Sequence, residues 1–223
     1  MTAERFQEAR RELRSLTAGF EKRVLLWLAA RMPGWVGPDH LTGLGLLGMV
    51  LAGVAYGVSA ERPAALHVVN LGLAMNWLGD SLDGTLARFR DRCRRRYGFY
   101  VDHLVDAFGA LFLLGGLALS GYMSERIALA LLVAYFLVSI NIYLATYTLG
   151  VFKISFGPFG GTEMRLLLAV GNLALLAWPR LTVMGRQLLL YDVLGALAIA
   201  ALAVVLIVSS ARNTRALYQL ERV

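Results

Sequence analysis

The sequence predicts an all-α, polytopic membrane protein: one domain of six transmembrane helices, preceded by an amphipathic helix on the membrane surface. Hydrophobic residues make up 58% of the 223 residues and charged residues only 17%, a balance typical of a chain whose solvent is lipid. A spanning helix needs about 20 apolar residues, so six spans and their connections nearly use up the chain. Backbone amides in lipid must bond within their own segment, so long apolar runs are predicted to be helices.

Residues 1–36 are predicted to form the amphipathic helix. Apolar side chains recur there at spacings of three and four, with arginine and lysine between them. Such a helix lies on the membrane, or packs on the protein's own cytosolic face; the two placements are compatible. No early apolar stretch of signal-peptide type is present, so no cleaved leader is expected. The apolar positions are Phe6, Ala9, Leu13, Leu16, Phe20, Val24 and Trp27.

Residues 37–211 are predicted to form the six-helix core, and residues 212–223 a cytosolic tail. Each apolar run in the core is close to the length that crosses a bilayer. The fifth run is the shortest. The runs lie at 41–58, 64–86, 99–120, 125–149, 164–178 and 187–210.

The basic residues predict the orientation. With the N-terminus in the cytosol, all but four of the 22 Lys and Arg residues fall on the cytosolic side, which favours both termini and the 88–98 loop in the cytosol. The net charge of +7 sits at the ends of apolar runs, which indicates anionic head groups and not nucleic acid as the partner. The four exceptions are Arg62, Arg126, Arg180 and Arg186.

Four aspartates border the second and third apolar runs. Asp80 and Asp83 are three residues apart, and Asp102 and Asp106 four apart, so on helices each pair shares one face. The pairs flank the turn near Arg92 at similar distances. We therefore expect the four carboxylates to meet at one depth, close to the cytosolic interface.

Four crowded carboxylates require compensating charge. Two divalent cations would neutralise them, and oxygen-only ligands favour Mg²⁺ or Mn²⁺ over zinc. Paired ions are a recurring device for in-line phosphoryl displacement. The simpler interpretation is a set of helix-end carboxylates paired with the loop arginines, but this would not require both spacings together with small neighbouring residues.

Small residues and one arginine surround the aspartates. Gly84 and Ala87 leave room for a ligand beside Asp83, and Gly98 opens the face of the third helix that carries Asp102. Arg88 follows Gly84 by one turn and has the geometry to bind a phosphate bidentately.

These residues closely resemble the signature of the CDP-alcohol phosphotransferases, and every fixed position is filled. The resemblance implies transfer of a substituted phosphoryl group from a CDP-linked alcohol to an acceptor hydroxyl, with release of CMP, in an enzyme of phospholipid biosynthesis that is commonly a homodimer. The matching string reads Asp80-x2-Asp83-Gly84-x2-Ala87-Arg88-x9-Gly98-x3-Asp102-x3-Asp106.

The resemblance also implies roles for single residues. Asp80, Asp83 and Asp102 would be metal ligands, while Asp106 would lie at the metals and act as the general base. The nucleotide site would be lined by Gly84, Ala87 and Arg88, with Gly98 beside them. Thr42 is a further nucleotide contact, in a stretch where Asp39 replaces the Asn usual in the family.

Two weaker signals concern the substrates. Lys153, Glu163 and Arg165 are charges on the cytosolic side at the mouth of the expected cleft, where they would bind an acceptor or its phosphate; the alternative is an ordinary loop and helix cap. His103 gives the motif an Asp-His-x-x-Asp form that resembles choline and ethanolamine phosphotransferases, although its side chain is expected to point away from both aspartates.

Other polar residues are predicted to be structural. The arginines between Arg90 and Arg96 are expected to form a solvated or lipid-facing run, and Cys93 among them to be a free thiol. His67, Asn70 and Asp192 are expected to make helix-to-helix hydrogen bonds on the far side of the membrane.

The donor favoured by the sequence is CDP-diacylglycerol, and the acceptor stays open. The alternative within the family is a CDP-choline or CDP-ethanolamine donor with a lipid acceptor. Outside it, a Mg²⁺-dependent membrane prenyltransferase would place its two aspartate motifs on separate hairpins, and a divalent-cation transporter would hold carboxylates near mid-membrane.

Overall fold

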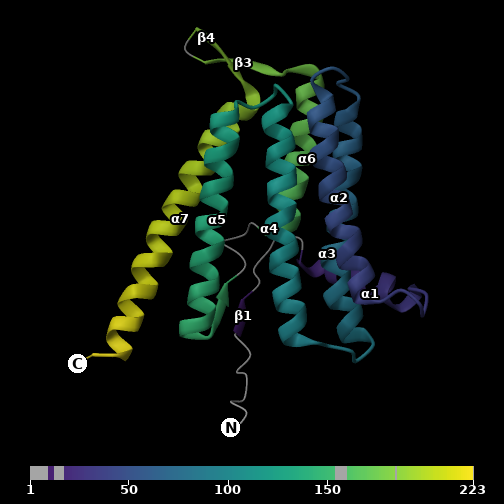
Figure 1. Ribbon diagram of the computed structural model, residues 1–223, viewed down its shortest axis with the longest axis vertical. Coiled ribbons are helices and arrows are strands. Elements are labelled where there is room, and N and C mark those ends of the chain that lie inside the picture. Colours follow the sequence, from purple (N-terminus) through teal and green to yellow (C-terminus); the bar gives the residue numbers. More distant parts are fainter. Residues whose placement is uncertain (1–9, 13–17, 154–159, 184, 223) are drawn as a thin grey trace.

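The computed structural model describes residues 10–12, 18–153, 160–183 and 185–222, and these form seven α-helices and four short strands (Figure 1). The strands are Arg10–Glu12 (β1), Val151–Lys153 (β2), Arg180–Val183 (β3) and Arg186–Leu189 (β4). The helices are Ala18–Arg31 (α1), Pro38–Ser59 (α2), Ala65–Phe89 (α3), Arg95–Leu119 (α4), Glu125–Leu149 (α5), Gly161–Ala177 (α6) and Leu190–Leu220 (α7).

Helices α2 to α7 lie at the six apolar runs, which confirms that these runs are helical except at the start of the sixth, where residues 187–189 belong to β4. Among the described residues, four of them are long and apolar enough to cross a membrane, namely α2, α4, α5 and α7, and they indicate a membrane protein. Side chains on α7 such as Val204 and Ile207 are 61% and 68% exposed, as expected where lipid replaces water around a helix. Helix α7 continues to Leu220, so most of the predicted tail is helical.

Helix α2 is central to the bundle, because it packs against both α3 and α4. Glycines allow this close approach: a Cβ added at Gly48 would meet the backbone of Gly72 and Asn76 on α3, and one at Gly53 would overlap Phe112 on α4. Small residues bring membrane helices together in this way, since packing and not water drives their association. The acidic ends of α3 and α4 therefore both lie beside α2.

The tightest contact between α2 and α4 predicts a measurable loss of stability. A Cβ at Gly116 would overlap the carbonyl oxygen of Gly53, so Gly116→Ala is expected to push the two helices apart and to lower the free energy of unfolding by about 1–3 kcal/mol. Gly115→Ala is the control, because nothing lies within 4 Å of its added Cβ and alanine favours a helix by up to about 1 kcal/mol. Thermal unfolding in detergent measures both; equal stabilities would contradict the contact.

Buried polar groups join the helices far from the aspartates. Asn172 on α6 accepts hydrogen bonds from the hydroxyls of Tyr56 (2.6 Å) and Tyr191 (2.7 Å), and its amide donates to Asn70 Oδ1 at 2.7 Å. The Asp192 carboxylate accepts from the Ser124 amide at 2.6 Å. The predicted helix-to-helix roles of Asn70 and Asp192 are confirmed.

The N-terminal segment differs from the single helix predicted for residues 1–36. Arg10–Glu12 is a strand paired in parallel with Val151–Lys153, so the helical prediction was wrong at these three residues, whose backbone groups bond to a distant strand. Helix α1 covers only Ala18–Arg31. The predicted positions Phe6, Ala9, Leu13 and Leu16 lie outside the described residues, and the side chain of Phe20 is likewise not described.

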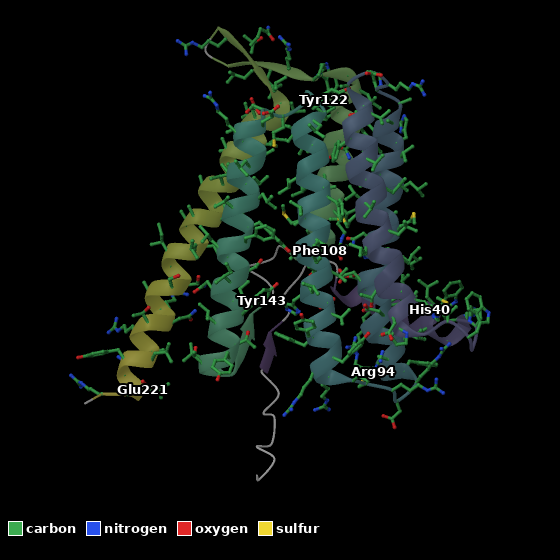
Figure 2. The ribbon with its side chains drawn as sticks, in the orientation of Figure 1. His40, Arg94, Phe108, Tyr122, Tyr143 and Glu221 are labelled. Atoms are coloured by element: carbon green, nitrogen blue, oxygen red, sulfur yellow. The ribbon has the colours of Figure 1, made fainter. Side chains whose placement is uncertain are left out.

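The ends of the bundle are distinct. Helix α1, the turn between α3 and α4, and the C-terminal end of α7 lie at one end, and the β3–β4 hairpin lies at the other (Figure 1). Arg94 and Glu221 mark the first end and Tyr122 the second (Figure 2). The aspartates belong to the half of the bundle that carries Arg94.

Candidate metal centre

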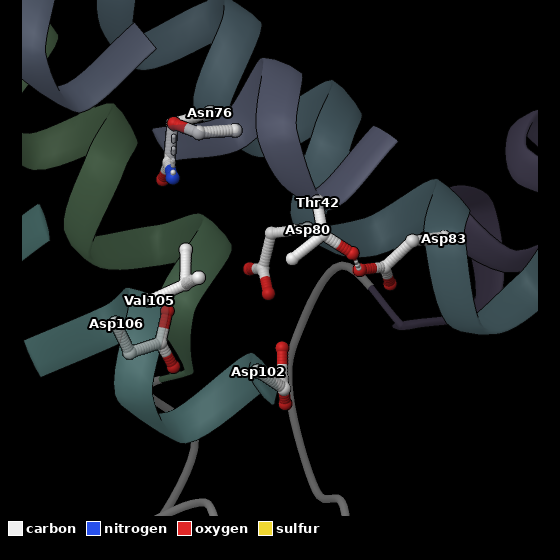
Figure 3. Close-up of a pocket in the computed structure, with 8 residues that line it drawn as sticks. Thr42, Asn76, Asp80, Asp83, Asp102, Val105 and Asp106 are labelled. Carbon is white, nitrogen blue, oxygen red and sulfur yellow. Dashed lines mark hydrogen bonds between the residues drawn. The ribbon is translucent and has the colours of Figure 1, made fainter. Parts of the chain in front are cut away.

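The four aspartates meet at one pocket between three helices. Asp80 and Asp83 come from α3, Asp102 and Asp106 from α4, and α2 contributes Thr42 and Gly45 (Figure 3). Asn76 and Val105 complete the lining. The expectation that both pairs reach one depth is therefore met, because α3 and α4 run in opposite directions from the turn that joins them and both pack on α2.

Three of the four carboxylates are close enough to share an ion. One oxygen from each of Asp80, Asp102 and Asp106 lies within 4.8 Å of the other two. Three carboxylate oxygens without a thiol or imidazole suit a hard cation such as Mg²⁺ or Mn²⁺, which water or substrate oxygens would complete. Acidic groups also gather without a metal, so the donor set fits an ion but does not by itself require one.

Asp83 is held apart from this group of three. Its carboxylate accepts a hydrogen bond from Thr42 Oγ1 at 2.6 Å and contacts the backbone amide of Gly84. Figure 3 shows Asp83 turned toward Thr42, on the side of Asp80 away from Asp106. A second ion, if bound, would have to lie on this side of the pocket.

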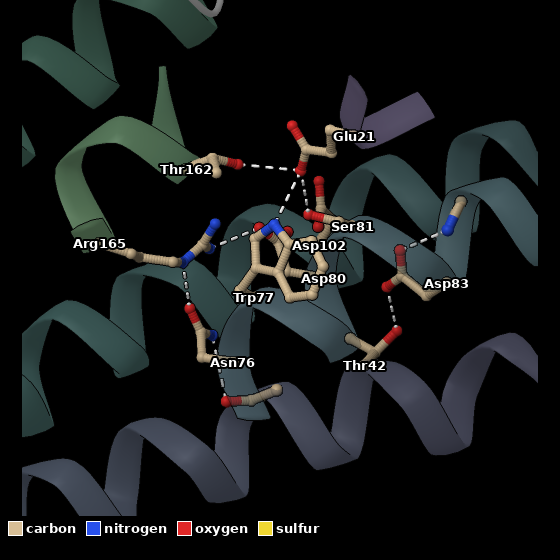
Figure 4. A network of polar contacts seen from close by, with 12 residues as sticks. Glu21, Thr42, Asn76, Trp77, Asp80, Ser81, Asp83, Asp102, Thr162 and Arg165 are labelled. Carbon is tan, nitrogen blue, oxygen red and sulfur yellow. Dashed lines mark hydrogen bonds and ion pairs between the residues drawn. The ribbon is translucent and has the colours of Figure 1, made fainter. Parts of the chain in front are cut away.

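Arg165 reaches into the centre from the first turn of α6. Its Nη2 lies 2.5 Å from Asp80 Oδ2, and its Nε donates to Asn76 Oδ1 at 2.7 Å (Figure 4). Asn76 in turn donates to the Gly45 carbonyl at 3.1 Å. The prediction that Arg165 lies at the mouth of the cleft understated its position, since it pairs directly with one of the aspartates.

Glu163, one of the two other predicted acceptor residues, does not line the pocket. Glu163 is buried at the start of α6, where its carboxylate accepts a hydrogen bond from the Gly160 amide at 2.9 Å; this bond caps the helix. Lys153 ends β2, and its side chain lies outside the described residues.

The predicted nucleotide residues divide into two groups. Thr42 lines the pocket, whereas the other four lie outside its lining. Arg88 is exposed and donates to Thr85 Oγ1 at 3.3 Å, on the same helix. At Gly98 an added Cβ would meet nothing within 4 Å, which leaves open space on that face of α4. The four are Gly84, Ala87, Arg88 and Gly98.

His103 packs between aromatic rings instead of entering the pocket. Its ring stacks on Phe99 at 4.1 Å between centroids and meets the edge of Tyr143 at 4.9 Å. Its Nδ1 lies 2.7 Å from the Phe99 carbonyl oxygen. The Nδ1 atom also lies 3.7 Å from Asp102 Oδ2, so the expectation that His103 points away from both aspartates is wrong for Asp102.

The turn between α3 and α4 is more ordered than a solvated run of arginines. The Arg90 guanidinium donates to the carbonyls of Val36 (2.5 Å), Met32 (2.8 Å) and Pro33 (2.9 Å). Arg94 forms an ion pair with Asp39, and the hydrogen bond to this carboxylate raises the pKa of Arg94 above its usual value. These two arginines fasten the turn to the segment that begins α2.

Sequence analysis missed three residues that organise this region: Asn76, Arg90 and Glu21. Asn76 lies one turn before Asp80 on the same face, so helical periodicity could have identified it. Arg90 carried no signal that separated it from its basic neighbours. Glu21 contacts residues 56 to 141 positions away, and no local pattern encodes such a contact.

Comparison with known proteins adds no relative: no protein-family model matches the chain, and no curated protein is significantly similar to it. The acidic motif and the geometry of the pocket are therefore the observations that bear on function.

Proposed function

We propose that this chain is an integral membrane enzyme of phospholipid biosynthesis that transfers a substituted phosphoryl group from a CDP-alcohol to an acceptor hydroxyl and releases CMP. The observation that carries the proposal is the convergence of Asp80, Asp102 and Asp106 on one pocket, in a chain whose spacing of aspartates and small residues resembles the CDP-alcohol phosphotransferases. Four apolar helices long enough to cross a bilayer support a membrane location.

Asp80, Asp102 and Asp106 would hold one Mg²⁺ or Mn²⁺, and Asp83 would help to hold a second on its side of the pocket. Such ions, when bound, neutralise the diphosphate of the donor and the charge that develops on the departing CMP. In the family motif Gly84, Ala87, Arg88 and Gly98 line the nucleotide site, and here Thr42 is the member of the predicted set that lines the pocket.

The proposed chemistry is a single in-line displacement. The acceptor oxygen forms a bond to the phosphorus distal to cytidine, and the bond from that phosphorus to the bridging oxygen breaks, so that CMP leaves with the electron pair. The Asp106 carboxylate takes the proton of the acceptor hydroxyl, which is the role of a general base. Arg165, which pairs with Asp80 beside the pocket, has the planar fork of N–H donors that suits a phosphate.

CDP-diacylglycerol is the proposed donor, and the position of Arg165 favours a phosphorylated acceptor such as an inositol phosphate or a glycerol phosphate. The alternative is a CDP-choline or CDP-ethanolamine donor with a lipid acceptor. His103, whose position in the motif favours that alternative, stacks on Phe99 instead of lining the pocket. This packing gives the alternative no structural support.

In the proposed topology α2 to α7 are six spans, α1 lies at the membrane interface, and the aspartates and both termini face the cytosol. Helices α3 and α6 would also cross the membrane in this topology; α6 packs on α3 and exposes apolar side chains such as Leu167 and Val170 on its outer face. A second copy of the chain would complete a homodimer. Labelling of the exposed thiol of Cys93 from the cytosolic side alone, in sealed vesicles, tests this orientation.

The test of function is CMP release by the purified protein reconstituted in lipid. CDP-diacylglycerol, CDP-choline and CDP-ethanolamine are each offered with a panel of alcohol and phosphorylated-alcohol acceptors. We expect CMP to appear only with an acceptor and with Mg²⁺ or Mn²⁺, and chelation to abolish it. Uptake of Mn²⁺ into sealed vesicles without CMP release would indicate a transporter, and transfer of a prenyl group from a prenyl diphosphate would indicate a prenyltransferase.

A further inference from the structure

Glu21 on α1 joins two helices of the metal centre through a single carboxylate oxygen. Its Oε1 accepts hydrogen bonds from Trp77 Nε1 (2.9 Å) and Ser81 Oγ (3.0 Å) on α3, and from Thr162 Oγ1 (2.9 Å) on α6 (Figure 4). Hydrogen bonds to an ionised carboxylate are stronger than those between neutral groups. The partners are 56, 60 and 141 residues away in sequence, so the contact is purely tertiary.

The residues of α3 that donate to Glu21 lie next in sequence to the residues that bond to Arg165. On α3, Trp77 and Ser81 donate hydrogen bonds to Glu21. The residues directly before them, Asn76 and Asp80, accept hydrogen bonds from Arg165. On α6, Thr162 and Arg165 are three residues apart in the first turn. Helices α3 and α6 are thus bridged twice at one level, by Glu21 and by Arg165.

The first turn of α6 has few other attachments to α3. Within the described residues, α3 and α6 are further joined by hydrogen bonds from Asn172 to Asn70 and from Asn70 to the Ala169 carbonyl, which lie two turns or more along α6. The long side chain of Arg165 loses rotamer freedom when it is held on Asp80. When the backbone of the α6 turn that carries Arg165 is already fixed, the entropic cost of holding this side chain on Asp80 is lower.

We propose that Glu21 is a positioning residue for the metal centre: it holds the first turn of α6 against α3 and so places the Arg165 guanidinium on Asp80. The Asp80 carboxylate is then shared between the Arg165 guanidinium and the proposed metal site. The guanidinium and a divalent ion compete for the same carboxylate, so weaker placement of Arg165 raises the affinity of the pocket for the ion. This consequence rests on the proposed metal function, whereas the placement itself does not.

The experiment measures Mn²⁺ binding to the full chain in lipid nanodiscs by electron paramagnetic resonance. Glu21→Ala and Glu21→Gln remove the same charge, but Gln keeps an acceptor oxygen. We expect Glu21→Ala to raise Mn²⁺ affinity by about 10-fold, the scale on which residues that support metal ligands act, and Glu21→Gln to raise it less. In an Arg165→Gln background the two variants should be equal.

A surface variant serves as the control for this experiment. Glu221→Ala removes an exposed carboxylate at the same end of the bundle and should leave Mn²⁺ affinity unchanged. If Glu21→Ala and Glu21→Gln act equally in the chain that retains Arg165, or if their difference persists without Arg165, the effect does not act through the placement of Arg165 and the proposal is overturned.

A thermal double-mutant cycle tests the placement even if the chain binds no Mn²⁺, an outcome that would count against the proposed function alone. If Glu21 positions Arg165, then Glu21→Ala already loses the Arg165–Asp80 contact. The double variant with Arg165→Gln should therefore lower the unfolding temperature by less than the two single shifts combined. Additive or larger losses would overturn the inference.

Discussion

Replacement of Asp106 by Asn is expected to lower kcat for CMP release by about 10²- to 10⁴-fold, the range that a general base supplies. Asn keeps the size of the side chain and an oxygen that can face the ion, but it cannot take the acceptor's proton. Binding of the CDP-alcohol is expected to persist, because in the proposed site the donor would be held by the ions and by other residues of the motif. The variant is reconstituted in lipid, and its kcat for CMP release is measured at saturating Mg²⁺. Binding of the CDP-alcohol is measured separately.

Asp91→Asn is the matched control for this prediction. Asp91 is exposed in the turn between α3 and α4 and has a φ of 51°, a left-handed conformation that Asn adopts as readily as Asp. We expect its turnover to be unchanged. Unchanged turnover in Asp106→Asn as well would remove Asp106 from the proton-transfer role.

The second large effect is expected from the proposed metal ligands, and it separates Asp102 from Asp83. Asp102→Asn removes one of the three carboxylates that lie within 4.8 Å of each other, so Mn²⁺ affinity should fall by at least about 10- to 100-fold, the cost of losing even a residue that only supports a ligand. Asp83→Asn leaves this group of three intact. We expect it to keep one Mn²⁺ and to lose the second.

Thr42→Val is the control for Asp83→Asn. It removes the 2.6 Å hydrogen bond to the Asp83 carboxylate but keeps the charge, so two ions should still bind. Titration with Mn²⁺, with bound and free ion separated by electron paramagnetic resonance, gives the stoichiometry. Two ions bound to Asp83→Asn, or an unaltered affinity in Asp102→Asn, would contradict this division of the four aspartates.

Much of the helical organisation was predictable from the sequence, because an apolar segment must satisfy its backbone hydrogen bonds internally. The run at 125–149 coincides with α5, Glu125–Leu149. The β1–β2 pair was not predictable: Arg10 pairs with Val151, and such a distant partner leaves no periodic signal in either segment. The start of the sixth run, at residues 187–189, belongs to the β3–β4 hairpin, because α7 begins only at Leu190.

The candidate centre was predictable in its residues but not in its contacts. Helical spacing placed Asp80 with Asp83, and Asp102 with Asp106, on shared faces, and the turn between α3 and α4 brought the pairs together. Spacing could not show that Thr42 draws Asp83 aside. A side chain adopts the rotamer that its neighbours allow, and those neighbours come from another helix.

The sequence by itself determined that this chain is a helical protein suited to a membrane and that four aspartates face one another across a hairpin, because both properties follow from local periodicity. Only the tertiary structure decided which carboxylates share a site and which residue compensates their negative charge. Arg165 reaches Asp80 across 85 residues of sequence, and Glu21 reaches Thr162 across 141. Charge compensation is a matter of distance in space, and that distance is set by the packing of α1, α3 and α6.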